Sequence, residues 1–219
     1  MKKKLSVILL AVLCVAALLG GCGNNSKIDS DGMTAVTLNE VAHSIFYAPM
    51  YVAIEEGYFA EEGIELTLIT GFGADKTMTA LLTDEADIGF MGSESTIYTY
   101  SEGASDYAVN FAQLTQRAGN FLVAREPIDH FDWNMLVGKE VLGGRAGGMP
   151  EMVFEYILKK NGIDPAGDLS IDQSIDFGST AAAFSGGQGE FTVESAGFLH
   201  ITDKPVCGIN SHIRNQSAM

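Results

Sequence analysis

Small polar residues and glycines follow three strand-like runs in the first half of the chain. His43-Ser44 comes after the apolar run 36–41 and precedes the aromatic pair Phe46-Tyr47. The other two stretches are 71–75 (GFGAD) and 92–94 (GSE). Hydroxyls, backbone amides and aromatic rings bind small molecules by hydrogen bonding and stacking in mostly apolar pockets. In open α/β sheets such ligands lie outside the carboxyl ends of the strands, where these three stretches fall.

Each of these stretches also has a purely structural interpretation. Phe46 and Tyr47 could belong to a core, the 71–75 turn could need glycine only for its backbone, and Ser93 could cap the next helix. The turn lacks the spacing of a nucleotide-binding fingerprint, although its amides could bind an anionic or carbonyl oxygen. From this half of the chain we predict the following ligand contacts: Ser44, Phe46, Tyr47, Phe72, Gly73, Ala74, Gly92, Ser93 and Glu94.

The second half adds fewer candidates. Gly147, Gly148 and Met149 stand directly before Pro150, where a helix is expected to begin. They are predicted to contact the ligand, although they could equally form a tight turn that allows close packing. Arg117 lies between the two halves and could pair with an anionic ligand or with surface acids. We retain it as a predicted contact.

No pattern indicates an enzyme or a metal centre. The chain has no His-Glu-x-x-His sequence, phosphate-binding loop or nucleophile elbow. The four histidines, His43, His130, His200 and His212, do not have ligand spacing. Nothing in the sequence marks Cys207 as activated. We therefore predict a binding protein without catalytic residues, metal or cofactor.

Helix and strand signals alternate along the chain. We expect strands at 36–41, 64–69, 87–91, 109–115, 121–124 and 169–175, and helices at 49–56, 74–83, 95–102, 150–161 and 180–184. This alternation predicts an α/β fold with mostly parallel sheets and helices on both faces. Trp133 is expected to be a packing residue in the second half.

The N-terminus has the pattern of an export signal. Lys2, Lys3 and Lys4 precede an apolar run of 15 residues, 5–19, which is short for a membrane-spanning helix. The run ends in Leu19-Gly20-Gly21-Cys22, which looks like a lipobox whose cysteine carries a lipid. A plain signal peptide is the alternative. Residues 1–22 are thus predicted to be a lipoprotein signal peptide with its lipobox cysteine, and residues 23–35 a flexible tether.

The charge of the chain limits its partners. The formal net charge is −15, and removal of residues 1–22 would leave 10 basic and 28 acidic residues, a charge of −18. Such acidity argues against binding to nucleic acid or to a membrane through a basic patch. Cys14 lies in the leader and Cys22 in the lipobox, so Cys207 has no cysteine to pair with in the mature chain.

Three segments together carry a family resemblance. They are 46–68 (FYAPMYVAIEEGYFAEEGIELTL), 80–95 (ALLTDEADIGFMGSES) and 138–165 (GKEVLGGRAGGMPEMVFEYILKKNGIDP). In the order and spacing of these segments, the chain resembles the extracytoplasmic solute-binding proteins of ABC importers. The branch in question includes binders of thiamine-pyrimidine precursors, sulfonates and nitrate.

The resemblance implies a two-lobed, periplasmic-binding-protein-like (type II) α/β fold, in which hinge-linked lobes close around a ligand. Lobe 1 would span 36–117 and an incomplete lobe 2 would span 118–194. It also implies a lipid-anchored monomer on the extracytoplasmic face of the cell membrane, which delivers a small molecule to an ABC permease. The aromatic first loop favours a flat heterocycle such as a thiamine-pyrimidine precursor. Sulfonate, taurine or nitrate binding and a pyrimidine-synthase-like enzyme are alternatives.

The last 25 residues, 195–219, differ from the rest. They contain a single acid, Asp203, whereas the preceding 194 residues contain the other 27. Proteins of the resembling family run on from the second lobe and return to the first. We therefore expect that residues 195–219 are an atypical tail, arising from truncation or a shifted reading frame, and that the chain could be a non-functional receptor. A divergent, shorter C-terminus is the alternative.

Overall fold

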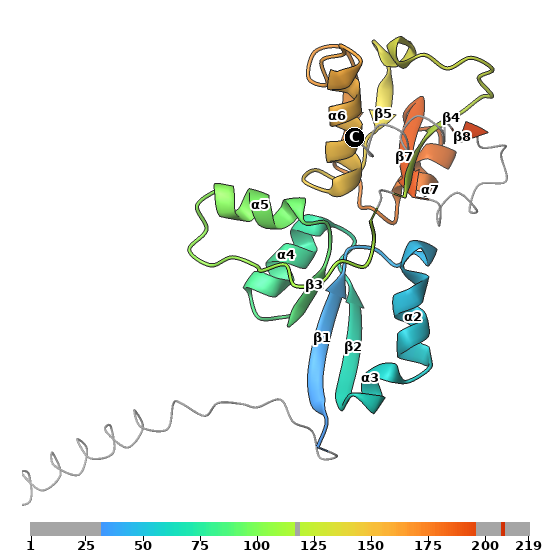
Figure 1. The fold of residues 1–219 in the computed structure, drawn as a ribbon. Coiled ribbons are helices and arrows are strands. Elements are labelled where there is room, and N and C mark those ends of the chain that lie inside the picture. Colours follow the sequence, from blue (N-terminus) through green and yellow to red (C-terminus); the bar gives the residue numbers. More distant parts are fainter. Residues whose placement is uncertain (1–31, 117–118, 196–206, 209–219) are drawn as a thin grey trace, which may run out of the picture.

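A computed structural model describes residues 32–116, 119–195 and 207–208, which form two lobes (Figure 1). Lobe 1 comprises residues 32–116, and lobe 2 comprises residues 119–195 together with 207–208. The elements confirm most of the predicted alternation of strands and helices. No helix in the described ranges is long and apolar enough to cross a membrane.

Lobe 1 contains a parallel sheet of three strands in the order β2-β1-β3. Its strands are β1 (Thr34–Glu40), β2 (Ile64–Thr70) and β3 (Ile88–Phe90), and its helices are η1 (Ile45–Tyr47), α2 (Ala48–Glu55), α3 (Tyr58–Glu61), α4 (Ala74–Leu82) and α5 (Glu94–Ser101). Helices α2 and α3 lie beside β2, and α4 and α5 lie beside β3 (Figure 1). The carboxyl end of β1 points toward lobe 2 (Figure 1). Because β3 runs parallel to β1, its carboxyl end points the same way.

Lobe 2 contains a sheet of five strands in the order β6-β5-β7-β4-β8. Its strands are β4 (Asn120–Ala124), β5 (Glu140–Leu142), β6 (Ser170–Asp172), β7 (Phe191–Ser195) and β8 (Cys207–Gly208), and its helices are η2 (Trp133–Leu136), α6 (Met149–Lys160) and α7 (Thr180–Ser185). In α6, Pro150 and Glu151 lie in the first turn and Lys159 and Lys160 in the last, as the helix dipole favours.

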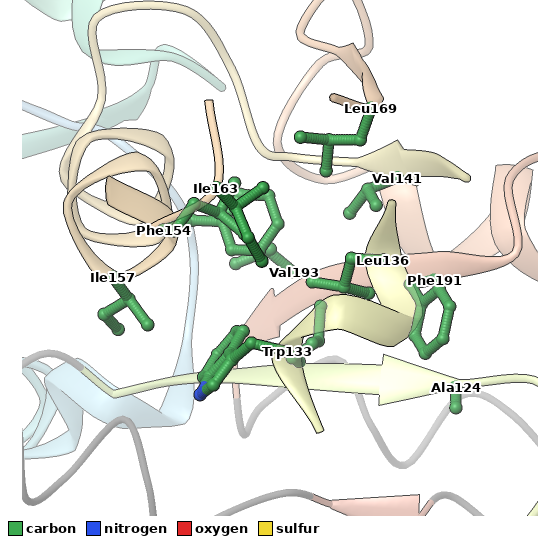
Figure 2. Close-up of a cluster of buried hydrophobic side chains, with 12 residues drawn as sticks. Ala124, Trp133, Leu136, Val141, Phe154, Ile157, Ile163, Leu169, Phe191 and Val193 are labelled. Carbon is green, nitrogen blue, oxygen red and sulfur yellow. The ribbon is translucent and has the colours of Figure 1, made fainter. Parts of the chain in front are cut away.

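The core of lobe 2 follows from strand alternation. Successive strand side chains point to opposite faces, so Leu122 and Val141 face α6 while Val123 and Leu142 face α7. Figure 2 shows the larger cluster, in which Phe154 of α6 meets side chains from the sheet. Trp133 belongs to this cluster and is 6% exposed, which confirms it as a packing residue of the second half.

One expectation about strands is corrected. Residues 109–115 do not form a strand, and Val109 and Phe111 are 75% and 77% exposed. Alternating apolar residues favour an extended backbone, but a strand also needs a neighbour, and none of the described strands pairs with this segment. The prediction of mostly parallel sheets is confirmed, because the β1–β2, β1–β3, β5–β6 and β5–β7 pairings are parallel. Strand β4 runs antiparallel to β7 and β8, so the lobe 2 sheet is mixed. Because β4 and β7 are antiparallel, Asn120 at the start of β4 pairs with Ser195 at the end of β7. Both residues lie at the lobe boundary.

Several predicted features fall outside the described residues. These are the signal peptide and lipobox Cys22, most of the tether, Arg117 between the lobes, and the greater part of the tail. Within the tail, the short strand β8 is described, and it adds to the edge of the lobe 2 sheet beside β4.

Candidate ligand-binding site

A cavity of about 1030 Å³ lies where the two lobes meet. From lobe 1 it is lined by the residues that follow β1 and β3 and by the first residues of α4 and α5. From lobe 2 it is lined by the start of α6 and by the ends of β4 and β7 at the boundary. The predicted contacts among its lining residues are Ser44, Phe46, Tyr47, Gly73, Ala74, Gly92, Ser93, Glu94, Gly148 and Met149.

The cavity is larger than a typical small-molecule pocket of roughly 300–1,000 Å³ because it continues along lobe 1. Its walls there are strand β3 on one side and residues 106–116 on the other. The outer edge of β3 pairs with no other described strand. The part nearest the boundary, where polar groups from both lobes converge, is the region suited to a small ligand.

A buried hydrogen-bond network fixes the loop after β1. Glu40 is completely buried, and its carboxylate accepts hydrogen bonds from the hydroxyls of Tyr51 (2.6 Å) and Thr70 (2.9 Å). The Tyr51 hydroxyl in turn accepts the backbone N–H of Ser44 at 3.0 Å. Burial, together with the hydrogen bond to Glu40, raises the pKa of Tyr51. The hydroxyl therefore stays protonated and keeps both hydrogen bonds.

Ser44 combines a structural role with its place on the cavity wall. Its side-chain oxygen accepts the backbone N–H of Phe46 at 3.3 Å and so caps the short helix η1. The cap places Phe46 and Tyr47 at the cavity. Phe46 lies so close to Gly119 that a methyl group on Gly119 would come within 2.7 Å of its ring. The first loop of lobe 1 therefore touches the start of lobe 2.

Tyr47 is held by aromatic packing. Its ring meets Phe90, at the end of β3, edge-on at a centroid distance of 4.6 Å. Burial, with the nearby charges of Glu40 and Glu94, raises the pKa of Tyr47 to about 12. Tyr47 is therefore a neutral phenol at physiological pH and offers an aromatic face with a hydroxyl donor.

An ion cluster joins the two lobes beside the cavity. Arg145 of lobe 2 donates two hydrogen bonds to Asp75 of α4, at 2.8 and 2.7 Å, and a third to Asp176 at 3.0 Å. Lys76 of α4 also pairs with Asp176, at 2.9 Å. The Arg145 guanidinium lowers the pKa of Asp75. The cluster occupies the guanidinium of the only arginine among the described lining residues.

Two predicted contacts lie elsewhere, and a third is not among the described residues. Phe72 has a positive φ of 58° and packs its ring against Gly178, so it contacts lobe 2 outside the cavity wall. Gly147 has a φ of 76° in the turn before α6 and does not line the cavity. Arg117 falls outside the described residues.

Glu94 is the most unusual polar group at the site. Its side chain is at the first residue of α5, it is only 3% exposed, and neither carboxylate oxygen has a hydrogen-bond partner in the described part of the chain. Burial raises the pKa of Glu94, and the backbone amides of Glu94 and Met149 oppose the rise. The carboxylate folds back over Gly92, where a Cβ atom would overlap it.

Sequence reasoning missed several lining residues, notably Arg145, Phe177, Val153 and Ser195. A signal existed for Arg145, because it is a single cation within the glycine-rich stretch 143–148. The other three lie inside or beside elements whose packing direction the sequence does not give. No group of three or more His, Cys, Asp or Glu residues in the described ranges could hold a metal ion.

The fold is similar to that of known solute-binding proteins. One solved structure is a protein from Bordetella bronchiseptica RB50, with a TM-score of 0.66 and 18% identity over 83% of this chain and 59% of that one. Another is the alkanesulfonate-binding protein SsuA from Xanthomonas axonopodis pv. citri bound to MOPS, with a TM-score of 0.59 and 16% identity over 74% and 54%. These likenesses confirm the predicted two-lobed α/β fold of the periplasmic-binding-protein type.

The sequence itself matches named relatives. Over 159 residues the chain is 54% identical to YtlA of Bacillus subtilis (strain 168), a candidate binding protein, with 73% of this chain and 48% of that protein covered. The chain thus spans about half the length of the relatives it matches. A family profile described as NMT1/THI5 like matches residues 45–193, which is more than half of the chain. The chain belongs to the NMT1/THI5-like family.

Proposed function

We propose that the chain is the solute-binding component of an ABC importer, which holds a small molecule in the interlobe cavity and delivers it to a permease. The observation that carries this proposal is the convergence of polar groups from both lobes on one cavity of about 1030 Å³. Ligands of two-lobed receptors contact both lobes, so that binding favours closure. The cavity wall meets this requirement through Ser44 and Glu94 of lobe 1 and Met149 and Ser195 of lobe 2.

The proposed function involves no chemical step. The cavity wall offers hydroxyls, aromatic rings and carboxylates, which suit the binding of a small molecule. A receptor of this kind releases its ligand unchanged. An enzyme would release a product, which mass spectrometry of the bound and released ligand distinguishes.

We further propose that the protein acts as a monomer on the extracytoplasmic face of the cell membrane, anchored only by a lipid on Cys22. The support is the order of three lysines, a 15-residue apolar run and the Leu19-Gly20-Gly21-Cys22 sequence. Labelling of cells with radioactive palmitate should mark the wild-type protein and not the Cys22→Ser variant.

The aromatic rings around the first loop of lobe 1, here called the aromatic wall, favour a flat heterocycle as the ligand, such as a thiamine-pyrimidine precursor. Phe46, Tyr47 and Phe90 present rings at or beside the loop that Ser44 caps. Sulfonate or nitrate is the second candidate class, because glycine-rich backbone at the starts of α4 and α6 could bind an anion. The alkanesulfonate-binding relative gives this class its support.

A thermal melt of the full chain in mild detergent tests the proposal. The chain is heated with and without pyrimidines, flavins, sulfonates and nitrate, because a ligand that binds only the native state raises the midpoint. A cooperative transition that one solute shifts would support a working receptor. No cooperative transition would contradict a working receptor.

A pair of neighbouring variants tests the aromatic wall. Phe46→Ala should weaken binding of a heterocycle by about ten-fold or more, because aromatic contacts dominate such sites. Ile45→Ala is the control, since Ile45 is 72% exposed and does not line the cavity. Equal affinity of the two variants by calorimetry would remove Phe46 from the site.

A further inference from the structure

We propose that Glu94 anchors a positively charged or N–H-donating group of the ligand, so that the cavity selects organic cations and amines over anions. This inference rests on the proposed function and specifies the chemical class of its ligand. It is carried by one buried carboxylate that makes no hydrogen bond of good geometry within the described residues, and by the charges around it.

The burial of Glu94 is only partly compensated within the described residues, because the nearby backbone amides of Glu94 and Met149 do not cancel the effect of burial on its pKa. A buried carboxylate loses its hydration, which is costly unless hydrogen bonds or an opposite charge replace it. Almost all buried polar groups in proteins have such a partner. Neither oxygen of Glu94 makes a hydrogen bond of good geometry within the described residues, and the residue is 3% exposed and lines the cavity. A ligand cation or amine would supply the missing donors.

Two features of the chain hold the carboxylate in this place. Glu94 lies in the first turn of α5, where the helix dipole favours a negative charge. Gly92 provides the space, because any larger residue would overlap the folded-back carboxylate. The backbone amide of Met149, at the start of α6, is near enough to favour the ionised form. The carboxylate therefore lies beside the cavity, between the two lobes.

The surrounding charges disfavour an anionic ligand. Asp87 and Asp106 also line the cavity, and the described wall contains no lysine. Its one described arginine, Arg145, already donates to Asp75 and Asp176. An anion would be repelled by the carboxylates of the cavity wall, whereas a cation would be attracted to them.

A second polar group, on the lobe 2 side of the cavity, supports a hydrogen-bonding ligand. Ser195 ends β7 in lobe 2, is 6% exposed, and its hydroxyl has no partner in the described ranges. Like Glu94, it lines the cavity. A flat ligand with an amine at one end and a further polar atom at the other could satisfy both residues.

Three flat probes that differ in charge test the inference by calorimetry on the full chain in mild detergent. Benzamidinium is a cation, benzamide is neutral and benzenesulfonate is an anion. The expected order of affinity is benzamidinium, then benzamide, then benzenesulfonate. The cation should bind about ten-fold or more tightly than benzamide, because a charge-assisted hydrogen bond is stronger than a neutral one.

Glu94→Gln should bring the benzamidinium-to-benzamide ratio close to one. Asp106→Asn is the matched control, since it removes an equal charge from the same cavity and should leave most of the preference. Gly92→Ala gives a second route if Glu94→Gln fails to fold, because its methyl group displaces the carboxylate while Glu94 is kept. It should reduce the preference in the same way.

The outcomes separate this inference from the proposed function. An unchanged ratio in Glu94→Gln, an equal loss in Asp106→Asn, or a preference for benzenesulfonate would each overturn the role of Glu94. Benzamide binding that persists in those experiments would leave the small-molecule receptor standing. Absence of binding by all three probes would overturn the inference. If, in addition, no solute of the thermal-melt panel raised the melting midpoint, the proposed receptor function would be overturned as well.

Discussion

The two lobes are stabilised in different ways. Both clusters of buried apolar side chains found in the described residues belong to lobe 2. In contrast, thirteen of the sixteen exposed large apolar side chains in the described ranges belong to lobe 1. Because burial of apolar surface is the main stabilising contribution to folding, lobe 2 is expected to hold most of the stability.

Lobe 1 has order of another kind. Its interior contains the Glu40 network and a hydrogen bond from buried Thr77 to Asn39 at 2.8 Å. Such networks specify the positions of side chains but contribute little net stability. The comparison teaches that the positioning of ligand-binding groups and the stability of the chain reside in different lobes. Each of the following variants tests one side of that division.

The largest effect is expected from the lobe 2 core. Phe154 is 2% exposed at the centre of the larger cluster. Phe154→Ala should lower the free energy of unfolding by about 3–5 kcal/mol, because it removes buried apolar contacts and leaves a cavity. Urea denaturation followed by fluorescence of Trp133, the single tryptophan, measures this change in lobe 2 itself.

The matched variant in lobe 1 is Phe111→Ala. Phe111 is 77% exposed, so its truncation should change the free energy of unfolding by no more than about 0.5 kcal/mol. A loss as large as that of Phe154→Ala would contradict the comparison, because it would show that the 109–115 segment is packed in solution.

The next effect is a pH dependence that comes from lobe 2. Glu194 of β7 is 3% exposed, and burial raises its pKa to about 7, opposed by hydrogen bonds from Thr180 and Thr192. The folded state therefore binds a proton that the unfolded state releases near pH 4.5. Stability from this group is complete below that pH and is lost as the pH rises through about 7.

Glu194→Gln should remove this loss. At pH 8 the variant should be more stable than the wild type by about 2–3 kcal/mol, since one unit of pKa shift corresponds to about 1.4 kcal/mol. At pH 4.5 the two should be nearly equal. Urea denaturation at both pH values measures the difference. Glu190→Gln is the control, because the pKa of that exposed carboxyl is lowered and its variant should gain nothing at pH 8.

The elements of the fold were largely predictable from the sequence because their signals are local. Pro150, Glu151, Lys159 and Lys160 mark α6, and the helix runs from Met149 to Lys160. Strand 64–69 was found as β2, Ile64–Thr70. The 109–115 segment was mispredicted as a strand, because its alternation says nothing about whether a neighbouring strand is present.

The site was predictable where it depends on position along the chain. Ser44, Gly73 and Glu94 follow strands or begin helices, and all three line the cavity. Arg145 could not be assigned in this way, because its role depends on Asp75, which lies seventy residues away in the other lobe. The Glu94 carboxylate makes no hydrogen bond of good geometry within the described residues. This is likewise a result of packing, which the sequence does not signal.

A smaller effect is expected from the polar network of lobe 1. Tyr51→Phe removes the hydroxyl that donates to Glu40 and accepts from Ser44. The free energy of unfolding should fall by about 1–2 kcal/mol, because a buried acceptor and a backbone N–H lose their partner. Ligand affinity should fall as well, since the loop that carries Phe46 is no longer fixed.

Tyr58→Phe is the matched control for this network. Tyr58 is 54% exposed, so loss of its hydroxyl should change neither stability nor affinity measurably. If Tyr51→Phe lowered stability but left ligand binding intact, the network would be structural only, and the proposed division of roles between the lobes would fail.

The smallest effect on stability is expected where the lobes meet. The ion pairs of Arg145 with Asp75 and Asp176 are partly exposed, so Arg145→Ala should cost less than about 1 kcal/mol. Its effect on shape should be larger, because the pairs join elements of different lobes. Small-angle X-ray scattering should show a larger radius of gyration for Arg145→Ala than for wild type without ligand.

Lys139→Ala is the control, because it breaks the pair with Glu190 inside lobe 2 and should leave the radius of gyration unchanged. If both variants kept the wild-type radius, the ion pairs of Arg145 would have no part in closure, and the lobes would be held by the Lys76–Asp176 pair and the contacts of Phe46 and Phe72.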